Sequence, residues 1–182
     1  MVHHTKAMKD DYKTLARLLF DICLLKKGPQ DLSLTDSTKK LAIISYVFVG
    51  TVLLSIDGPL DEAFIKAFIE VLMLMLFMFA LLTFYSLPKR FDQTITALLG
   101  TGALLSMISL PFMIWLADVQ QNQSTVGLLG LIIFLLVCWS FAVMGHIIRE
   151  ATQTSLTLSL LLTFCYLFLS YQLINLIYPL GA

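Results

Sequence analysis

Apolar residues form five long runs between residue 41 and the C-terminus, and short polar connections separate them. Each run is about 20 residues long, which is the length a helix needs to cross ~30 Å of hydrocarbon. We therefore expect an all-α fold, a polytopic membrane helix bundle with five transmembrane helices in one domain, residues 41–182. The predicted spans cover about residues 41–56, 62–86, 94–116, 125–148 and 152–177.

Residues 1–40 differ from the rest and are expected to form a cytoplasmic N-terminal segment. Within it, a predicted helix at about residues 7–26 has apolar side chains at three- and four-residue steps and basic side chains on much of its other side. The apolar face contains Tyr12, Leu15, Leu19 and Ile22, and the polar face contains Lys9, Lys13 and Arg17. Such an amphipathic helix is typical of one that lies in the membrane interface and binds anionic lipid, or docks a partner. The alternative is that its apolar face packs on the bundle itself.

The charges along the chain predict its orientation in the membrane. Eight of the 12 Lys and Arg residues precede the first run, and the connections that follow are alternately without and with basic residues. Since basic residues collect on the cytoplasmic side, this alternation places the N-terminus inside and the C-terminus outside. We expect an integral protein of a bacterial inner membrane.

Composition and motifs argue against several classes of function. The chain has no net charge and no basic surface interleaved with aromatic residues, so we expect no nucleic-acid partner. Cys23, Cys138 and Cys165 are isolated, which leaves neither a disulfide framework nor a paired-cysteine metal site. The common hydrolase, metalloprotease and nucleotide-binding motifs are missing as well. We therefore expect a protein that is not an enzyme, with no catalytic or metal-ligating residue.

One carboxyl group, that of Glu70, lies well inside the second predicted span. An acidic residue near a span centre costs roughly 2.5–3.5 kcal/mol on insertion scales, and such residues often mark ion or proton pathways. Lys66 is four residues earlier on the same helix, where an ion pair can offset part of that cost. Lys66 and Glu70 are thus a candidate intramembrane polar pair, either structural or part of a transport path.

A second candidate group, at the inner end of the fourth predicted span, consists of His146, Arg149 and Glu150. His146 is expected to be capped at the membrane interface, with a proton relay as the alternative. It is the only histidine in any predicted span, so a haem held by two histidines of one chain is excluded. We expect no cofactor.

Small and polar residues recur on the third and fifth predicted spans. In lipid such stripes allow close backbone approach and hydrogen bonds between helices. The predicted helix-packing positions are Gly100, Gly102, Ser106, Ser155, Ser159 and Thr163.

The segment from Ser86 to Leu98, with the sequence Ser-Leu-Pro-Lys-Arg-Phe-Asp-Gln-Thr-Ile-Thr-Ala-Leu, leads into a helix that contains Pro111. A short basic loop followed by a "Thr-x-x-Ala-Leu" helix with a proline near its far end resembles bacterial members of the Yip (Ypt-interacting protein) superfamily. The five spans and the cytoplasmic N-terminus are similar to that family too. The resemblance implies membrane organisation rather than a catalytic reaction.

Two functions remain open from the sequence. The leading hypothesis is a non-enzymatic scaffold or accessory subunit that associates with membrane lipid and with other membrane proteins or its own copies. The alternative is a small transporter or channel with Lys66 and Glu70 in its path.

Overall fold

The structure is a computed structural model that describes residues 2–32, 35–119 and 126–178, with side chains considered from Lys13 onward. These residues form six α-helices and two short 3-10 helices, η1 and η2. Helices α2 to α6 are long and apolar enough to cross a membrane, and α1 precedes them. The expected fold class, a five-span helical membrane bundle, is confirmed. The elements are α1 (Val2–Cys23), η1 (Pro29–Asp31), α2 (Asp36–Leu54), α3 (Leu60–Phe84), η2 (Pro88–Arg90), α4 (Phe91–Val119), α5 (Val126–Thr152) and α6 (Leu156–Ile177).

Local capping groups explain where several helices begin and end. Thr35 precedes α2: its backbone N–H donates to Thr38 Oγ1 at 3.1 Å, so α2 starts five residues before the predicted span. At the other end of the chain, α5 continues to Thr152 and α6 begins only at Leu156. The predicted fifth span therefore started too early, because Gln153 adopts a left-handed conformation, φ 57°, that ends α5.

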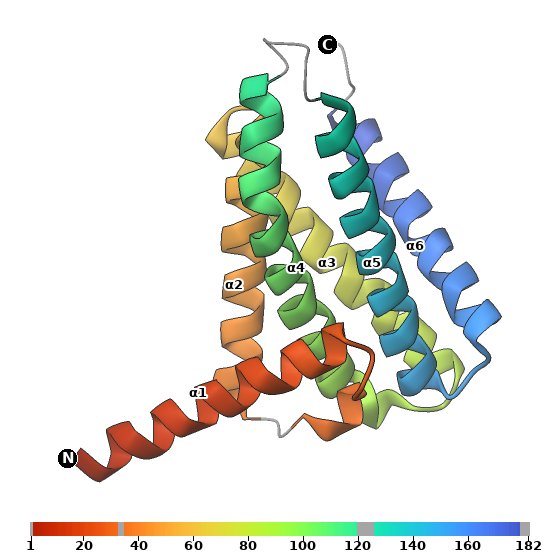
Figure 1. Ribbon diagram of the computed structural model, residues 1–182. Helices are drawn as coiled ribbons and strands as arrows, with labels where there is room; N and C mark the ends of the chain where they lie inside the picture. Colours follow the sequence, from red (N-terminus) through yellow and green to blue (C-terminus); the bar gives the residue numbers. More distant parts are fainter. Residues whose placement is uncertain (1, 33–34, 120–125, 179–182) are drawn as a thin grey trace.

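Helix α4 lies at the centre of the arrangement and contacts α2, α3, α5 and α1 (Figure 1). Helix α2 also packs on α3, and α6 packs on α5 and more weakly on α3. The first half of α4 is consequently enclosed, and every residue from Thr94 to Thr101 is buried. In its second half, most residues are exposed or half-buried, as in a helix that faces lipid. The helix continues through Pro111.

Helix α1 lies across one end of the bundle, and its N-terminal part extends away from it (Figure 1). Leu15, Leu19 and Ile22 are buried, with 7%, 7% and 0% of their surfaces exposed. The expectation that this whole face is free to meet lipid or a partner is therefore wrong; of the three residues, only Leu15 and Leu19 also border a groove between α1, α2 and α4. Their face is covered by α4 and α5 of the same chain, because the apolar stripe removes more surface from water by packing there. Lys13 and Arg17 are exposed, whereas Tyr12 and Lys9 have side chains outside the described set.

Candidate functional site

The side chain of Glu70 borders a small cavity at the centre of the membrane bundle. The cavity has a volume of about 120 Å³ and is lined by residues from all five spans. Its polar groups come from five residues on different helices, Tyr46, Glu70, Thr101, Ser140 and Tyr166. The side chains of Tyr46 and Glu70 both line the cavity, and the Tyr166 hydroxyl donates to the Glu70 backbone carbonyl at 3.5 Å. The five helices thus surround one acidic side chain with hydroxyl groups.

Lys66 does not join this group. Its ammonium lies 3.1 Å from Glu62 Oε2, one turn earlier on α3, and 4.7 Å from the centre of the Tyr178 ring. The predicted Lys66–Glu70 ion pair is therefore wrong for this conformation. A lysine can reach a carboxylate one turn before or one turn after it, and here it takes the one nearer the membrane surface, where both charges stay partly solvated.

A second cavity adjoins the first and extends toward the end of the bundle opposite α1. Its volume is about 270 Å³, and Leu105 and Ser140 line both cavities. Ser106 and Ser109 of α4 contribute further hydroxyl groups to it. Hydroxyl-bearing residues therefore follow one another from the bundle centre toward that end.

The chemistry available at Glu70 is that of a carboxyl group among hydroxyl-bearing residues, in a space large enough for several water molecules. A carboxyl with neighbouring hydroxyls can hold a proton or a small cation through oxygen atoms. Among the described residues, no group of three or more His, Cys, Asp or Glu side chains is placed to hold a metal ion.

At the end of the bundle near α1, the predicted polar cluster divides into His146, which bonds to the segment after α1, and the neighbouring pair Arg149 and Glu150. His146 Nε2 lies 3.0 Å from the Lys27 backbone oxygen, so this nitrogen carries the proton, because a carbonyl can only accept. Arg149 and Glu150 form an ion pair at 3.4 Å. His146 serves as the expected interfacial cap, on the chain segment that follows α1.

The structure adds two residues to this cluster that sequence reasoning missed. Arg90 donates to the backbone oxygens of Ala151 and Glu150 at 3.1 and 3.4 Å, and the Gln30 amide donates to Glu150 Oε2 at 3.3 Å. The carbonyls are the unpaired acceptors at the end of α5. The network therefore joins η1 and η2 to the turn between α5 and α6. In the sequence, the basic loop at Lys89-Arg90 indicated only the side of the membrane on which it lies. It did not indicate that Arg90 bonds to the last carbonyls of α5.

Trp139 and Cys23 form another contact between α1 and α5. The indole Nε1 of Trp139 donates to the backbone oxygen of Cys23, the last residue of α1, at 2.9 Å. The Cys23 thiol is buried, and this burial raises its pKa from 9.0 to about 11. A thiol in this state is a poor nucleophile at neutral pH.

The predicted packing stripes fit helices of the same chain against one another. A Cβ atom at Gly100 would lie 2.7 Å from a methyl group of Leu19, and one at Gly102 would lie 2.6 Å from the ring of Tyr46. Glycine at these two positions lets α1 and α2 approach α4 closely. Ser106 lines the second cavity.

On α6, Ser159 and Thr163 are fully buried and lie on the side that packs against α5. Ser155, assigned to the same packing stripe, is exposed and caps the start of α6, since its hydroxyl accepts from Leu158 N at 3.4 Å. The packing role predicted for Ser155 is therefore wrong. The α5 glycine that meets this stripe, Gly145, was missed.

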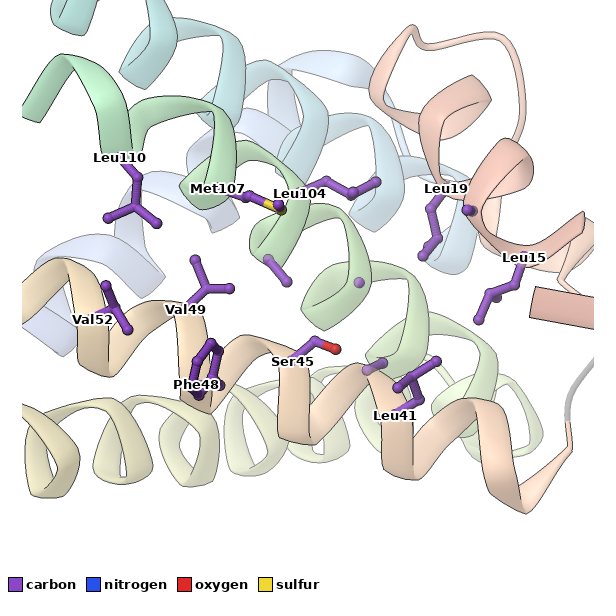
Figure 2. A pocket seen from close by; sticks show the side chains of 14 residues that line it. Leu15, Leu19, Leu41, Ser45, Phe48, Val49, Val52, Leu104, Met107 and Leu110 are labelled. Atoms are coloured by element: carbon purple, nitrogen blue, oxygen red, sulfur yellow. The ribbon is translucent and has the colours of Figure 1, made fainter. Parts of the chain in front are cut away.

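An apolar groove of about 430 Å³ lies between α1, α2 and α4. Figure 2 shows its side chains between α2 and α4, from Leu15 and Leu19 at one end to Val52 and Leu110 at the other. The Ser45 hydroxyl is the one polar side-chain group among the lining residues. We call this feature the α1–α2–α4 groove.

The α1–α2–α4 groove opens on the outer surface of the bundle. Leu41, Phe48 and Met107 at its rim expose 41%, 68% and 63% of their surfaces, whereas Ala42 and Ala103 at its base are buried. An apolar recess open toward the membrane is accessible to hydrocarbon.

Two tyrosines of the central cavity, Tyr46 and Tyr166, were missed by sequence reasoning. Each lies in the middle of a span, whereas tyrosine usually collects at the two membrane surfaces, where its hydroxyl meets water. A tyrosine far from both surfaces needs a polar partner inside the bundle, and that departure was the available signal.

No protein-family model, curated protein or solved structure matches this chain.

Proposed function

We propose that this chain is a non-enzymatic scaffold or accessory subunit of a membrane, which associates with lipid and with other membrane proteins or its own copies. The observation that supports it is the α1–α2–α4 groove, whose apolar lining and opening toward the membrane suit hydrocarbon or an apolar partner surface. Many large apolar residues on α3, α5 and α6 are also exposed, which is the surface that lipid or a second helix contacts.

The proposal includes an orientation and a setting. Because α1 and the basic η2 segment lie at the same end of the bundle, the positive-inside rule favours a cytoplasmic position for this end. The N-terminus would then be cytoplasmic and the C-terminus outside, in a bacterial inner membrane. The resemblance to the Yip superfamily points to membrane organisation in the same way.

Native mass spectrometry of the full chain released from nanodiscs, together with cross-linking in the native membrane, tests this proposal. We expect bound lipid and either self-association or one reproducible membrane-protein partner. A chain that is released alone and cross-links to no protein in the membrane would contradict it.

The central cavity supports a second candidate, a small transporter or channel for protons or a small cation. Glu70 has no ion pair with Lys66, and the two adjoining cavities carry hydroxyl groups from the bundle centre toward the end opposite α1. An acidic side chain in such a place is a functional candidate in a membrane protein.

Flux into proteoliposomes separates the two candidates. A transporter requires a proton or cation flux that Glu70→Gln abolishes and that Glu62→Gln leaves intact. The second substitution is a matched control, because it makes the same chemical change two turns earlier on α3. Without flux in the unmodified protein, the transport candidate fails and the scaffold proposal is unaffected.

A further inference from the structure

We infer that the α1–α2–α4 groove binds one acyl chain of an anionic phospholipid from the membrane leaflet on the side of α1. This inference deepens the proposed lipid association by naming the class of lipid and its site. The argument rests on the accessibility, the size and the chemistry of the groove, and on the charges at its end.

The polarity of the lining excludes water as a stable occupant. A buried water molecule needs two to four polar partners, and the side chains of the groove offer only the Ser45 hydroxyl. Leaving the space empty would forfeit the dispersion contacts of its apolar walls. Because Phe48 and Met107 at the rim are exposed, hydrocarbon from the membrane has direct access to it.

The length and volume of the groove suit a single acyl chain. From Leu41 to Val52, the lining residues of α2 span roughly 16 Å of helix axis. An apolar cavity of about 150 Å³ holds one benzene molecule, so the groove has room for roughly 17 carbons at the same ratio, as in one acyl chain.

Charged residues at the end of the groove near α1 favour an anionic headgroup. Lys13 lies one turn before the lining residue Ala16, Arg17 follows Ala16 directly, and Lys40 precedes the lining residue Leu41. All three basic side chains are exposed. Of the acidic residues at this end, Asp21 and Asp92 are already paired, with Lys27 and Lys39. Asp36 is the exposed first residue of α2, four residues before Lys40, and no ion pair joins these two described side chains. A phosphate attached to a chain in the groove would meet unneutralised basic groups there.

Photolabelling of the full chain in nanodiscs tests the inference. The probes are phosphatidylglycerol and phosphatidylcholine that carry a diazirine on one acyl chain, and adducts are mapped by peptide mass spectrometry. We expect adducts concentrated on Phe48, Val49 and Met107, with more of them from phosphatidylglycerol. Adducts spread evenly over exposed residues such as Phe164 and Phe168 of α6 would overturn it.

Two variants make the test specific. Ala103→Phe fills the base of the groove and should lower groove adducts about tenfold, which corresponds to a loss of about 1.4 kcal/mol of binding free energy. Ala80→Phe places the same side chain on an exposed position of α3 and should leave them unchanged. Thermal unfolding of both variants verifies that they fold. Equal labelling of the groove in Ala103→Phe and in the unmodified chain would contradict the inference.

The headgroup preference is tested with Lys13→Gln, Arg17→Gln and Lys40→Gln combined. We expect the phosphatidylglycerol excess to fall at least tenfold while neutral-lipid adducts persist, since each basic group near an anionic surface contributes to attraction. Equal labelling by both lipids in the unmodified chain would overturn the anionic assignment.

The experiments distinguish a failure of the partner-binding hypothesis from a failure of the lipid-binding hypothesis. Groove labelling in a chain that associates with no protein contradicts the scaffold part of the proposed function alone. An unlabelled groove in a chain that does associate contradicts this inference alone, and so do cross-links from the groove to another protein.

Discussion

The indole nitrogen of Trp139 on α5 donates a hydrogen bond of 2.9 Å to the backbone oxygen of Cys23, the last residue of α1. The last carbonyls of a helix have no partner within it, so this bond satisfies an acceptor that α1 leaves open. Together with the bond from His146 to the Lys27 carbonyl, it fixes the end of α1 to α5. The position of α1, and hence the α1–α2–α4 groove, depends on these contacts.

Replacing Trp139 with Phe should weaken the attachment of α1. The lost hydrogen bond corresponds to about 0.5–1.5 kcal/mol of stability, and amide hydrogen exchange in α1 should become faster. Trp115→Phe is the control, because Trp115 is 49% exposed and Trp139 is 48% exposed. Exchange rates in α1 that match those of the unmodified chain would show that this bond does not hold the helix.

The Cys23 thiol should resist alkylation in the folded protein. Its pKa is about 11 rather than 9.0, so the reactive thiolate is scarce at neutral pH. We expect maleimide to label a variant with Cys138→Ser and Cys165→Ser slowly at pH 7 in mild detergent and rapidly after unfolding in SDS. Fast labelling of the folded protein at pH 7 would contradict the buried position of Cys23.

The same group predicts a pH dependence of stability. The folded state holds the thiol proton more tightly than the unfolded state. The contribution of Cys23 to the free energy of unfolding is therefore fully present below about pH 9. It is lost as the pH rises from about 9 to about 11. Thermal unfolding of the unmodified chain and of Cys23→Ala across this range should show a steeper alkaline loss for the unmodified chain.

The close approach of α2 and α4 at Gly102 should tolerate no side chain. In Gly102→Ala the new methyl group would lie 2.6 Å from the Tyr46 ring, and moving the ring should cost about 1–3 kcal/mol. Gly130→Ala on α5 meets no atom within 4 Å and should be neutral or stabilising by up to ~1 kcal/mol. Thermal unfolding in the same detergent compares them. Equal stabilities of the two variants would remove the packing role of Gly102.

Double-mutant cycles should distinguish the two possible partners of Lys66. The pair with Glu62 is partly exposed, with 26% and 40% of the side chains accessible, so its coupling should be only about 0.2–1 kcal/mol. The cycle between Lys66→Met and Glu70→Gln should show no coupling within error. A larger coupling to Glu70 would restore the pair that the sequence spacing suggested.

The case of Lys66 shows why spacing alone did not identify the partners of Glu70. Glu62 and Glu70 lie four residues before and after Lys66, so both are its neighbours on the helix surface and spacing does not favour either. The hydroxyl groups of Tyr46 and Tyr166 come from α2 and α6, and no local pattern relates them to α3. The amphipathic pattern of α1 likewise predicted an apolar face correctly, yet not that α4 and α5 cover it.

The number of spans, the predominance of helix and an amphipathic first helix were determined by the sequence. Hydrocarbon allows only apolar segments of about 20 residues with internally paired backbone groups to cross it. Each of the five runs meets this requirement by its length and composition. Only the tertiary structure decided that α2 lies beside α4, that α1 closes one end of an apolar groove, and that five helices meet around Glu70. The physical reason is that lipid tails and neighbouring helices are equally apolar, so hydropathy cannot tell a helix face that meets lipid from one that meets another helix.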